Sequence, residues 1–228
     1  MQQPIDNSAQ SARPNRSLAT SVLRVSLIAL VLGLSYVPWI PFPWKMPLVG
    51  LLGMGLVWAE TRSVSSIGLQ RHSIVRSLGW IALLLILVIG IVSPLVQPLV
   101  DYLTDSKTDY SAYGALRGNL PAAAHLIALA WLSAAVGEEL VFRAFLMHHL
   151  AALMETWRGG RIVAAVLGGA VFGLMHSTQG ISGIVITGIV GTLFGYVYLR
   201  SNRNLWAMIL AHGLIDTWGV TTLYLGWY

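Results

Sequence analysis

Long apolar runs are the feature that most constrains the fold of this 228-residue chain. A helix needs about 20 apolar residues to cross the hydrocarbon core of a membrane. Hydrophobic residues make up 56% of the chain and charged residues 10%, whereas soluble domains carry about 25% charged residues. We therefore predict an all-α, polytopic membrane helix bundle of about seven spans (six to eight). The predicted spans are Leu18–Ile40, Met46–Ala59, Ile74–Val100, Leu120–Met154, Arg161–His176, Ile181–Leu199 and Leu205–Tyr228.

The positive charges favour one orientation of these spans. With the N-terminus in the cytoplasm, ten of the 14 Lys and Arg residues fall in inner segments and three in outer segments. This bias follows the positive-inside rule, so we expect a cytoplasmic N-terminus and an outer C-terminus. The weakest span is Met46–Ala59, because its apolar run is short and prolines crowd its start. A re-entrant or interfacial segment is the alternative there.

Composition also excludes several classes of site. The chain has no cysteine, which excludes disulfides, zinc–thiolate sites, iron–sulfur clusters and cysteine nucleophiles. The net charge of +5 more often sets orientation in a membrane protein than it binds nucleic acid, so we expect no nucleic-acid partner.

Three charged residues stand near the middle of the fourth predicted span, in the string AAVGEELVFRAFLMHHL. Glu138, Glu139 and Arg143 together cost roughly 7–10 kcal/mol on insertion scales of about 2.5–3.5 kcal/mol each. Glu139 and Arg143 have the i,i+4 spacing of an ion pair. Glu138 lies about 100° around the helix from Glu139 and therefore points away from that pair. A carboxylate without a counter-ion in a low-dielectric site is suited to act as a general base. A purely structural polar cluster is the alternative.

Two more helices carry polar pairs at helical spacing. Phe172 and His176 lie at i and i+4 near the end of the fifth span, and His212 and Asp216 do so within the apolar seventh span. Two ionisable groups on one stripe of a membrane helix favour a functional site. The other histidines are expected to be interfacial: His72, His125, His148 and His149.

Three motifs therefore occur in order on three predicted membrane helices: Glu138-Glu139-x-x-x-Arg143, Phe172-x-x-x-His176 and His212-x-x-x-Asp216. They resemble the motifs of the CPBP family, the CAAX-prenyl-protease and bacteriocin-processing proteins, which is also called the Abi family. The resemblance covers about Leu120 to Tyr228. It implies catalytic helices at 120–228. The apolar runs and the charges place N-terminal membrane helices at 18–119 and a polar cytoplasmic tail at 1–17 before them.

The resemblance implies a glutamate-dependent intramembrane endopeptidase. In that family pattern Glu138 would activate water with the assistance of His176. His212 and Asp216 would polarise the scissile carbonyl and hold the oxyanion. The supporting residues would be Glu139, Arg143 and Phe172.

Metal use stays open at this stage. Glu138, His176 and His212 are also a ligand set for zinc with a fourth position for water, although a metal-free glutamate–histidine mechanism is also proposed for the family. An ionised Asp216 cannot donate to an oxyanion. It is therefore protonated, or orients His212, or helps to bind a metal.

The expected partners are membrane lipid and a peptide or protein substrate, with lipid modification as one form of that substrate. The expected location is a bacterial-type plasma membrane. One alternative is a rhomboid-type serine protease that uses Ser182 with His212. A non-catalytic immunity or scaffold protein and a proton-coupled transporter are further alternatives.

Residues that form one site must lie at a similar depth in the membrane, so the depth of each candidate along its helix tests the predicted site. Counted from the predicted inner ends at about 1.5 Å per residue, Glu138 lies about 24 Å deep, His176 about 22 Å and His212 about 12 Å. A common site therefore requires tilted helices, staggered helix ends or different boundaries.

Overall fold

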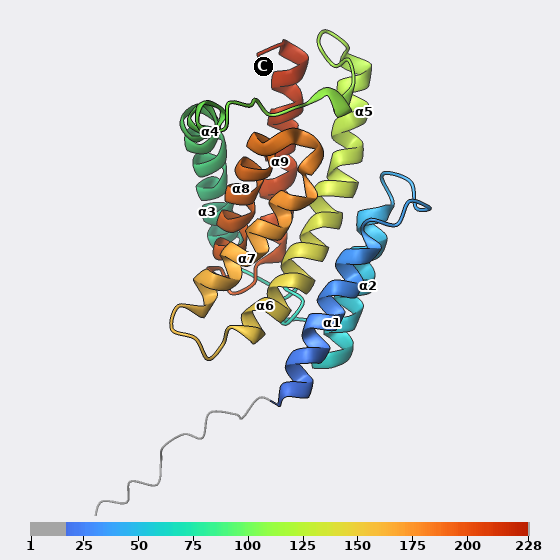
Figure 1. Ribbon diagram of the computed structural model, residues 1–228, viewed down its shortest axis with the longest axis vertical. Coiled ribbons are helices and arrows are strands. Elements are labelled where there is room, and N and C mark those ends of the chain that lie inside the picture. The colour runs from blue at the N-terminus through green and yellow to red at the C-terminus, as the bar shows by residue number, and fades with distance from the viewer. Residues whose placement is uncertain (1–16, 228) are drawn as a thin grey trace, which may run out of the picture.

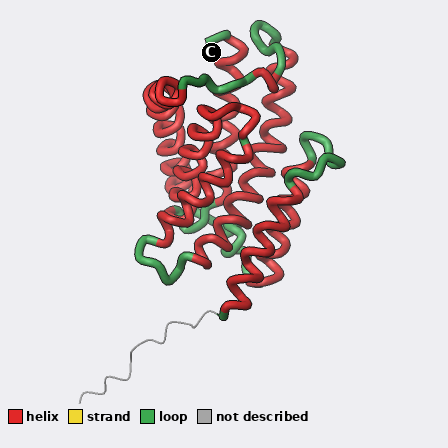
Figure 2. The backbone as a smooth tube through the Cα atoms, viewed as in Figure 1, coloured by secondary structure: helices red, strands yellow, loops and turns green. Residues whose placement is uncertain are grey.

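The computed structural model describes residues 17–227, and this part of the chain is all helical, without a strand (Figures 1 and 2). Residues 1–16 of the predicted polar tail and the last residue of the seventh predicted span, Tyr228, lie outside the described residues. The all-α prediction is confirmed.

Seven helical segments follow the seven predicted apolar stretches. Two of them are long rods in which α-helical ends flank a central π-helical stretch. The first rod runs from α3 through Ile86–Val96 to α4, and the second from α5 through Trp131–Glu138 and Leu140–Leu146 to α6. The helices are α1 (Leu18–Leu34), α2 (Lys45–Thr61), α3 (Ile74–Leu85), α4 (Gln97–Thr104), α5 (Leu120–Ala130), α6 (Met147–Leu153), α7 (Gly160–Met175), α8 (Gly180–Arg200) and α9 (Leu205–Leu225).

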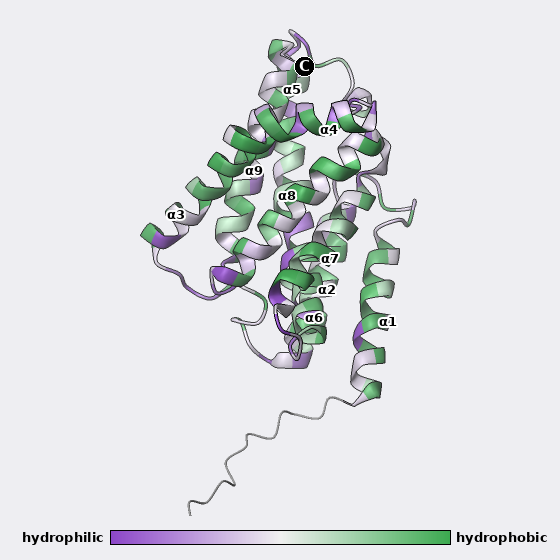
Figure 3. Ribbon diagram, turned by 60° about the vertical axis from the view of Figure 1, so that its left-hand side comes forward, coloured by the Kyte–Doolittle hydropathy of each residue, from purple (hydrophilic) through white to green (hydrophobic). Residues whose placement is uncertain are grey.

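Three segments of the described chain are long and apolar enough to cross a membrane: Ile74–Thr104, Leu120–Leu153 and Ser177–Arg200. Helices α1 and α7 are apolar but shorter. Large hydrophobic side chains such as Leu18, Ile74 and Val75 are about 80% exposed on the outside of the bundle. Hydrophobic residues accordingly colour much of the helical ribbon green in Figure 3. Such a surface is stable in lipid rather than in water, as expected of a membrane protein.

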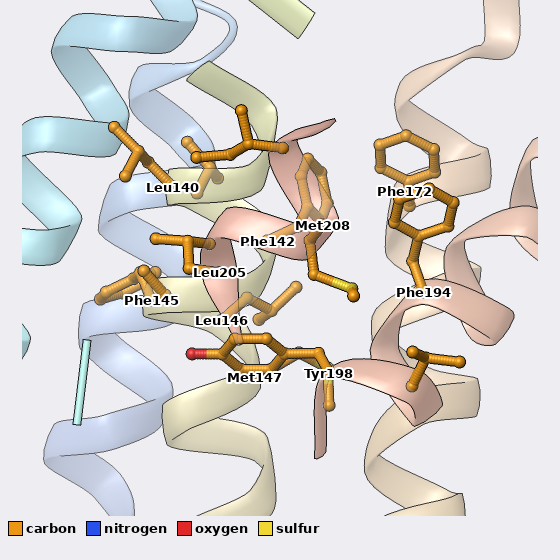
Figure 4. Close-up of a cluster of buried hydrophobic side chains, with 14 of the residues drawn as sticks. Leu140, Phe142, Phe145, Leu146, Met147, Phe172, Phe194, Tyr198, Leu205 and Met208 are labelled. Atoms are coloured by element: carbon orange, nitrogen blue, oxygen red, sulfur yellow. The ribbon is translucent and has the colours of Figure 1, made fainter. Parts of the chain in front are cut away.

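The second rod, which we call the central rod (Leu120–Leu153), holds the bundle together. It contacts α2 and α9 along its π-helical part and α7 near its end. Its residues Leu140–Leu150 are buried, and they anchor the main hydrophobic cluster (Figure 4). π-Helical turns are rare and frequently lie at functional sites, and here they contain Glu138 and Arg143.

Glycines allow α7 and α8 to pack closely, through the G-x-x-x-G steps Gly169–Gly173 and Gly191–Gly195. A side chain at Gly169 would collide with Thr192, and one at Gly173 would collide with the backbone oxygen of Ile184. A side chain at Gly191 would likewise meet the ring of Phe172. The close approach brings Phe172 and the adjoining end of α7 against the inside of the bundle.

The start of α9 is buried, so it is one of the staggered helix ends that a common site requires. Leu205 is 0% exposed and Asn204, which caps the helix, is 1% exposed. The backbone N–H of Leu205 donates to the carbonyl of Gly68, and the Asn204 amide donates to Ser77. The chain between α2 and α3 thus covers this helix end, so the start of α9 lies inside the bundle rather than at its surface.

Candidate active site

The ion pair predicted from the i,i+4 spacing is present. Arg143 Nε lies 3.1 Å from Glu139 Oε2, and the two side chains are 2% and 0% exposed. The guanidinium also lies 5.2 Å from the ring centre of Phe172 and 5.1 Å from that of Phe194. Figure 4 shows both rings in the buried cluster. Cation–π contacts strengthen when the cation is desolvated, so the rings and the carboxylate together make burial of this arginine tolerable.

Glu139 also fixes His212 on α9. Nδ1 of His212 lies 2.8 Å from Glu139 Oε1. A carboxylate only accepts hydrogen bonds, so Nδ1 carries the proton and donates it. The other ring nitrogen, Nε2, lies 3.7 Å from Asp216 Oδ2 and 4.0 Å from Glu138 Oε2. Both distances exceed a hydrogen bond, which leaves Nε2 free to face a substrate.

His176 is oriented by the backbone of its own helix. Its Nδ1 lies 2.8 Å from the carbonyl oxygen of Phe172. A carbonyl only accepts, so Nδ1 donates and Nε2 of the neutral ring keeps a lone pair. This lone pair is available to accept a proton from water.

One cavity of about 480 Å³ collects all four residues that sequence predicts to be catalytic. Glu138 of the central rod, His176 after α7, and His212 and Asp216 of α9 all line it, although they come from three separate segments. The rest of its wall is mostly apolar, from residues such as Val92 and Ile186. A second cavity of about 230 Å³ adjoins the first, and Glu138 and His176 line both.

Sequence reasoning missed Tyr113, which lies in the loop between α4 and α5 and lines the larger cavity. Its hydroxyl accepts a 2.8 Å hydrogen bond from Nε2 of Gln179. Partial burial of the ring, and then the nearby carboxylates of Asp216 and Glu138, raise the pKa of Tyr113 to about 12. The hydroxyl therefore stays protonated and able to donate at physiological pH. Its position depends on long-range folding of a polar loop, so no local pattern signals it.

Ser182, the nucleophile of the rhomboid-type alternative, lies elsewhere. Its hydroxyl hydrogen bonds to Asp101 and to Thr108, the latter at 3.2 Å. The side chain is fully buried and does not line either cavity. Ser182 therefore helps to fasten the loop after α4 to the start of α8, and no histidine within residues 17–227 is its partner.

His148 and His149, which sequence predicts to be interfacial, are both buried in a polar cluster with Glu60. His148 Nε2 lies 3.2 Å from Glu60 Oε2. The Nδ1 atoms accept from guanidinium groups, that of His148 from Arg203 at 3.1 Å and that of His149 from Arg24 at 2.9 Å. Arg24 also pairs with Glu60. This cluster joins α1, α2, the central rod and the turn before α9.

Two groups of side chains can be compared as metal sites: the predicted catalytic residues that line the cavity, and the cluster around Glu60. Within residues 17–227, the cluster of Glu60, His148 and His149 has ligand atoms all within 4.8 Å of one another, whereas Glu138, His176 and His212 form no such set. His148 lies ten residues after Glu138, or about 15 Å along the helix, so the two places are separate. The predicted zinc ligand set is therefore not preformed, and arginines already use the Nδ1 lone pairs of the other cluster.

Comparison with known proteins agrees with this geometry. Residues 120–218 match a family model, Rce1-like, described as type II CAAX prenyl endopeptidase Rce1-like. The match supports a membrane protease of the CAAX type, and it identifies residues 120–218 as an Rce1-like domain similar to those of the CPBP/CAAX protease family. The resemblance drawn from the three motifs is thereby confirmed. No curated protein and no solved structure matches the chain.

Proposed function

We propose that this protein is an intramembrane endopeptidase that hydrolyses membrane-associated or lipid-modified peptides in a bacterial-type plasma membrane. One observation carries the proposal: Glu138, His176, His212 and Asp216 come from three segments and line one cavity. Peptide hydrolysis needs an activated water and donors for the developing oxyanion. The largely apolar wall suits an apolar or lipidated substrate, and the four polar groups supply the chemistry.

In the proposed mechanism Glu138 is the general base. Its carboxylate is 18% exposed and faces the cavity, whereas the neighbouring carboxylate of Glu139 is fully buried against Arg143. Glu138 takes a proton from water while the water oxygen bonds to the scissile carbonyl carbon. Nε2 of His176 accepts a hydrogen bond from the same water and orients it. Glu138 then passes the proton to the leaving amine, and the bond between carbon and nitrogen breaks.

His212 is the proposed donor to the oxyanion. Its Nδ1–H is held by Glu139, which balances the charge of a doubly protonated ring. Nε2–H then points at the cavity without a closer partner than Asp216, at 3.7 Å. Asp216 stabilises the charged ring in this proposal and need not itself donate. Loss of a single oxyanion donor typically costs about 10²–10³ in kcat.

Two alternatives have weaker support. A rhomboid-type serine mechanism lacks a histidine partner for Ser182 among the described residues and leaves Glu138 without a role. A non-catalytic immunity or scaffold protein would not need Glu138, His176 and His212 to face a shared cavity. A proton relay would use the same buried groups, but it predicts transport rather than cleavage.

The experiment compares the wild-type protein with Glu138→Gln in liposomes, using quenched fluorescent peptides with and without an S-farnesyl cysteine near the C-terminus. We expect hydrolysis by the wild type and a decrease of at least about 10²-fold in Glu138→Gln. Ser182→Ala that melts like the wild type should keep its activity. Equal turnover by the wild type and Glu138→Gln would overturn the proposal, as would proton-coupled uptake without hydrolysis.

A further inference from the structure

The proposed oxyanion site has one donor so far, which is Nε2 of His212. Its neighbour Asp216 carries a carboxylate, and an ionised carboxylate only accepts hydrogen bonds. Sites that stabilise the oxyanion of acyl transfer commonly present two donors, and loss of either one lowers the rate. A second donor in the wall of the same cavity would therefore complete the site.

Tyr113 reaches this cavity from the loop between α4 and α5. Figure 1 shows the loop as a green segment that crosses the bundle. The backbone N–H of Asp109 donates to the carbonyl of Gln179, and Thr108 shares a hydrogen bond with Ser182, so the loop is fastened to the start of α8. The fastened loop holds Tyr113 in the wall of the larger cavity, which the four predicted catalytic residues also line.

The hydroxyl proton of Tyr113 is available to a ligand. Its oxygen accepts a 2.8 Å hydrogen bond from Nε2 of Gln179, which is itself buried. A hydroxyl that accepts one hydrogen bond can still donate its own proton. Among residues 17–227 no acceptor for that proton lies within hydrogen-bond distance. Gln179 therefore fixes the oxygen while the proton remains free to meet a substrate.

The charges around the phenol indicate that it lies on the side of the cavity to which His212 points. The carboxylate of Asp216 acts on the phenol more strongly than that of Glu138. Asp216 is also the nearer of the two to Nε2 of His212, at 3.7 Å against 4.0 Å. Burial, and then these two carboxylates, raise the pKa of Tyr113 to about 12. The phenol is therefore neutral at physiological pH and can donate to an anion.

Most other donors in the cavity wall already have partners within the described chain: Gln97, Thr108, Tyr110, Arg143, Gln179 and Thr187. Ser133 is the main competitor. It precedes Glu138 by five residues in a π-helix, which places the two one turn apart on the same face of the central rod. Ser133 is therefore on the side of the base, from which water attacks, whereas the second donor is needed beside His212.

We infer that the phenol of Tyr113 is a catalytic residue, the second hydrogen-bond donor to the oxyanion beside His212. As water adds to the scissile carbonyl carbon, the carbonyl oxygen becomes negative and accepts hydrogen bonds from both groups. The proton of Tyr113 stays on its own oxygen throughout. The carbonyl forms again when the bond to the leaving amine breaks. This inference rests on the proposed endopeptidase function and adds a residue that none of the three motifs contains.

The kinetic test is Tyr113→Phe, which keeps the ring and removes the donor. The substrate is the quenched S-farnesyl peptide in liposomes. Because the hydrogen bond strengthens only in the transition state, we expect kcat and kcat/KM to fall together by about 10²–10³, with KM within about threefold of the wild type. Tyr102→Phe is the matched control, since Tyr102 is 82% exposed and lines neither cavity. It should keep the wild-type kinetics.

A tetrahedral inhibitor gives a readout that a merely structural role would not move. The probe is the same peptide with a phosphinate in place of the scissile amide, so that an anionic oxygen occupies the position of the oxyanion. Tyr113→Phe should weaken its binding by about 10²-fold. Binding of the intact substrate, compared between Glu138→Gln and Glu138→Gln with Tyr113→Phe, should change far less. Equal effects on the two ligands overturn the inference, as does a loss of phosphinate affinity in Ser133→Ala but not in Tyr113→Phe.

Incorporation of 3-fluorotyrosine at position 113 keeps the test decisive if Tyr113→Phe does not fold. Fluorine makes the phenol a stronger acid, and only the neutral phenol donates to an oxyanion. The decrease of kcat at alkaline pH should therefore begin at a lower pH than in the wild type. An alkaline profile that does not move contradicts a donor role for Tyr113.

Cleavage by the wild type separates this inference from the proposed function. If the wild type cleaves the peptide and Tyr113→Phe cleaves it with the same kcat, the endopeptidase stands and the inference about Tyr113 is wrong. If the wild type does not cleave the peptide, the proposed function fails. Phosphinate binding with and without the phenol then still decides whether Tyr113 donates to a tetrahedral anion.

Discussion

A 2.8 Å hydrogen bond from His212 Nδ1 to Glu139 Oε1 joins α9 to the central rod at the edge of the cavity. The same carboxylate holds Arg143 through its other oxygen. One buried glutamate thus orients a site histidine and neutralises a buried cation. The two tasks predict different consequences when the residues are replaced.

Replacement of Arg143 by Met alone leaves Glu139 as a buried charge without its partner. Breaking a buried pair in this way costs about 3–5 kcal/mol, whereas replacing both members by apolar residues is often neutral. We therefore expect Arg143→Met to lower the melting temperature in detergent, and Glu139→Leu with Arg143→Met to recover much of it. The double variant should remain inactive, because His212 loses its acceptor. Recovery of both stability and activity would contradict the positioning role of Glu139.

Tyr113 provides a prediction for alkaline pH. Burial first, and then the carboxylates of Asp216 and Glu138, raise its pKa from 10.0 to about 12. Below pH 10 the phenol is neutral in both folded and unfolded chains and adds no pH dependence. Between pH 10 and about 12 the unfolded chain loses the proton first, so the free energy of unfolding falls as pH rises.

Tyr113→Phe removes that titration. Thermal melts between pH 9 and pH 12 should show a smaller decrease in melting temperature for Tyr113→Phe than for the wild type. Because the wild-type hydroxyl stays protonated below pH 10, the pH profile of activity should keep its shape there in the variant, with a lower maximum if the hydroxyl contacts substrate. Parallel melting curves for the two proteins across the alkaline range would show that Tyr113 is not perturbed.

Removal of metal ions tests whether the proposed peptidase works without a bound metal. Glu138, His176 and His212 form no preformed ligand set, and arginines occupy the Nδ1 atoms of His148 and His149. We expect the purified protein to keep its peptidase activity after dialysis against a chelator, with elemental analysis showing less than stoichiometric zinc. Loss of activity that is restored by added zinc, together with one bound zinc per chain, would instead favour a metalloprotease.

Sequence predicted the helices and the pairing of Glu139 with Arg143 because both depend on local spacing and on the cost of charge in lipid. It also selected Glu138, His176, His212 and Asp216, which line one cavity. It did not predict how the histidine and carboxylate of α9 come to line the same cavity as Glu138. That depends on the buried start of α9 under the chain around Gly68, which is a long-range contact.

Local sequence patterns also fail to predict the surroundings of residues that are fixed by long-range contacts alone. His148 and His149 resemble interfacial residues in sequence, yet both are buried and accept hydrogen bonds from Arg24 and Arg203 of distant segments. Tyr113 lies in a polar loop with no motif, and it reaches the cavity only because Gln179 fixes it there.

Packing of α7 against α8 determines where His176 stands, and this can be tested by glycine replacement. A Cβ at Gly173 would collide with the backbone oxygen of Ile184, whereas a Cβ at Gly79 in α3 meets nothing within 4 Å. Overpacking of this kind costs about 1–3 kcal/mol, but alanine is the better helix former at an open position. We expect Gly173→Ala to lower the melting temperature in detergent and to decrease peptidase activity, since α7 must move away from α8. Gly79→Ala should leave both unchanged or raise the melting temperature, and equal behaviour of the two variants would show that α7 and α8 do not pack through these glycines.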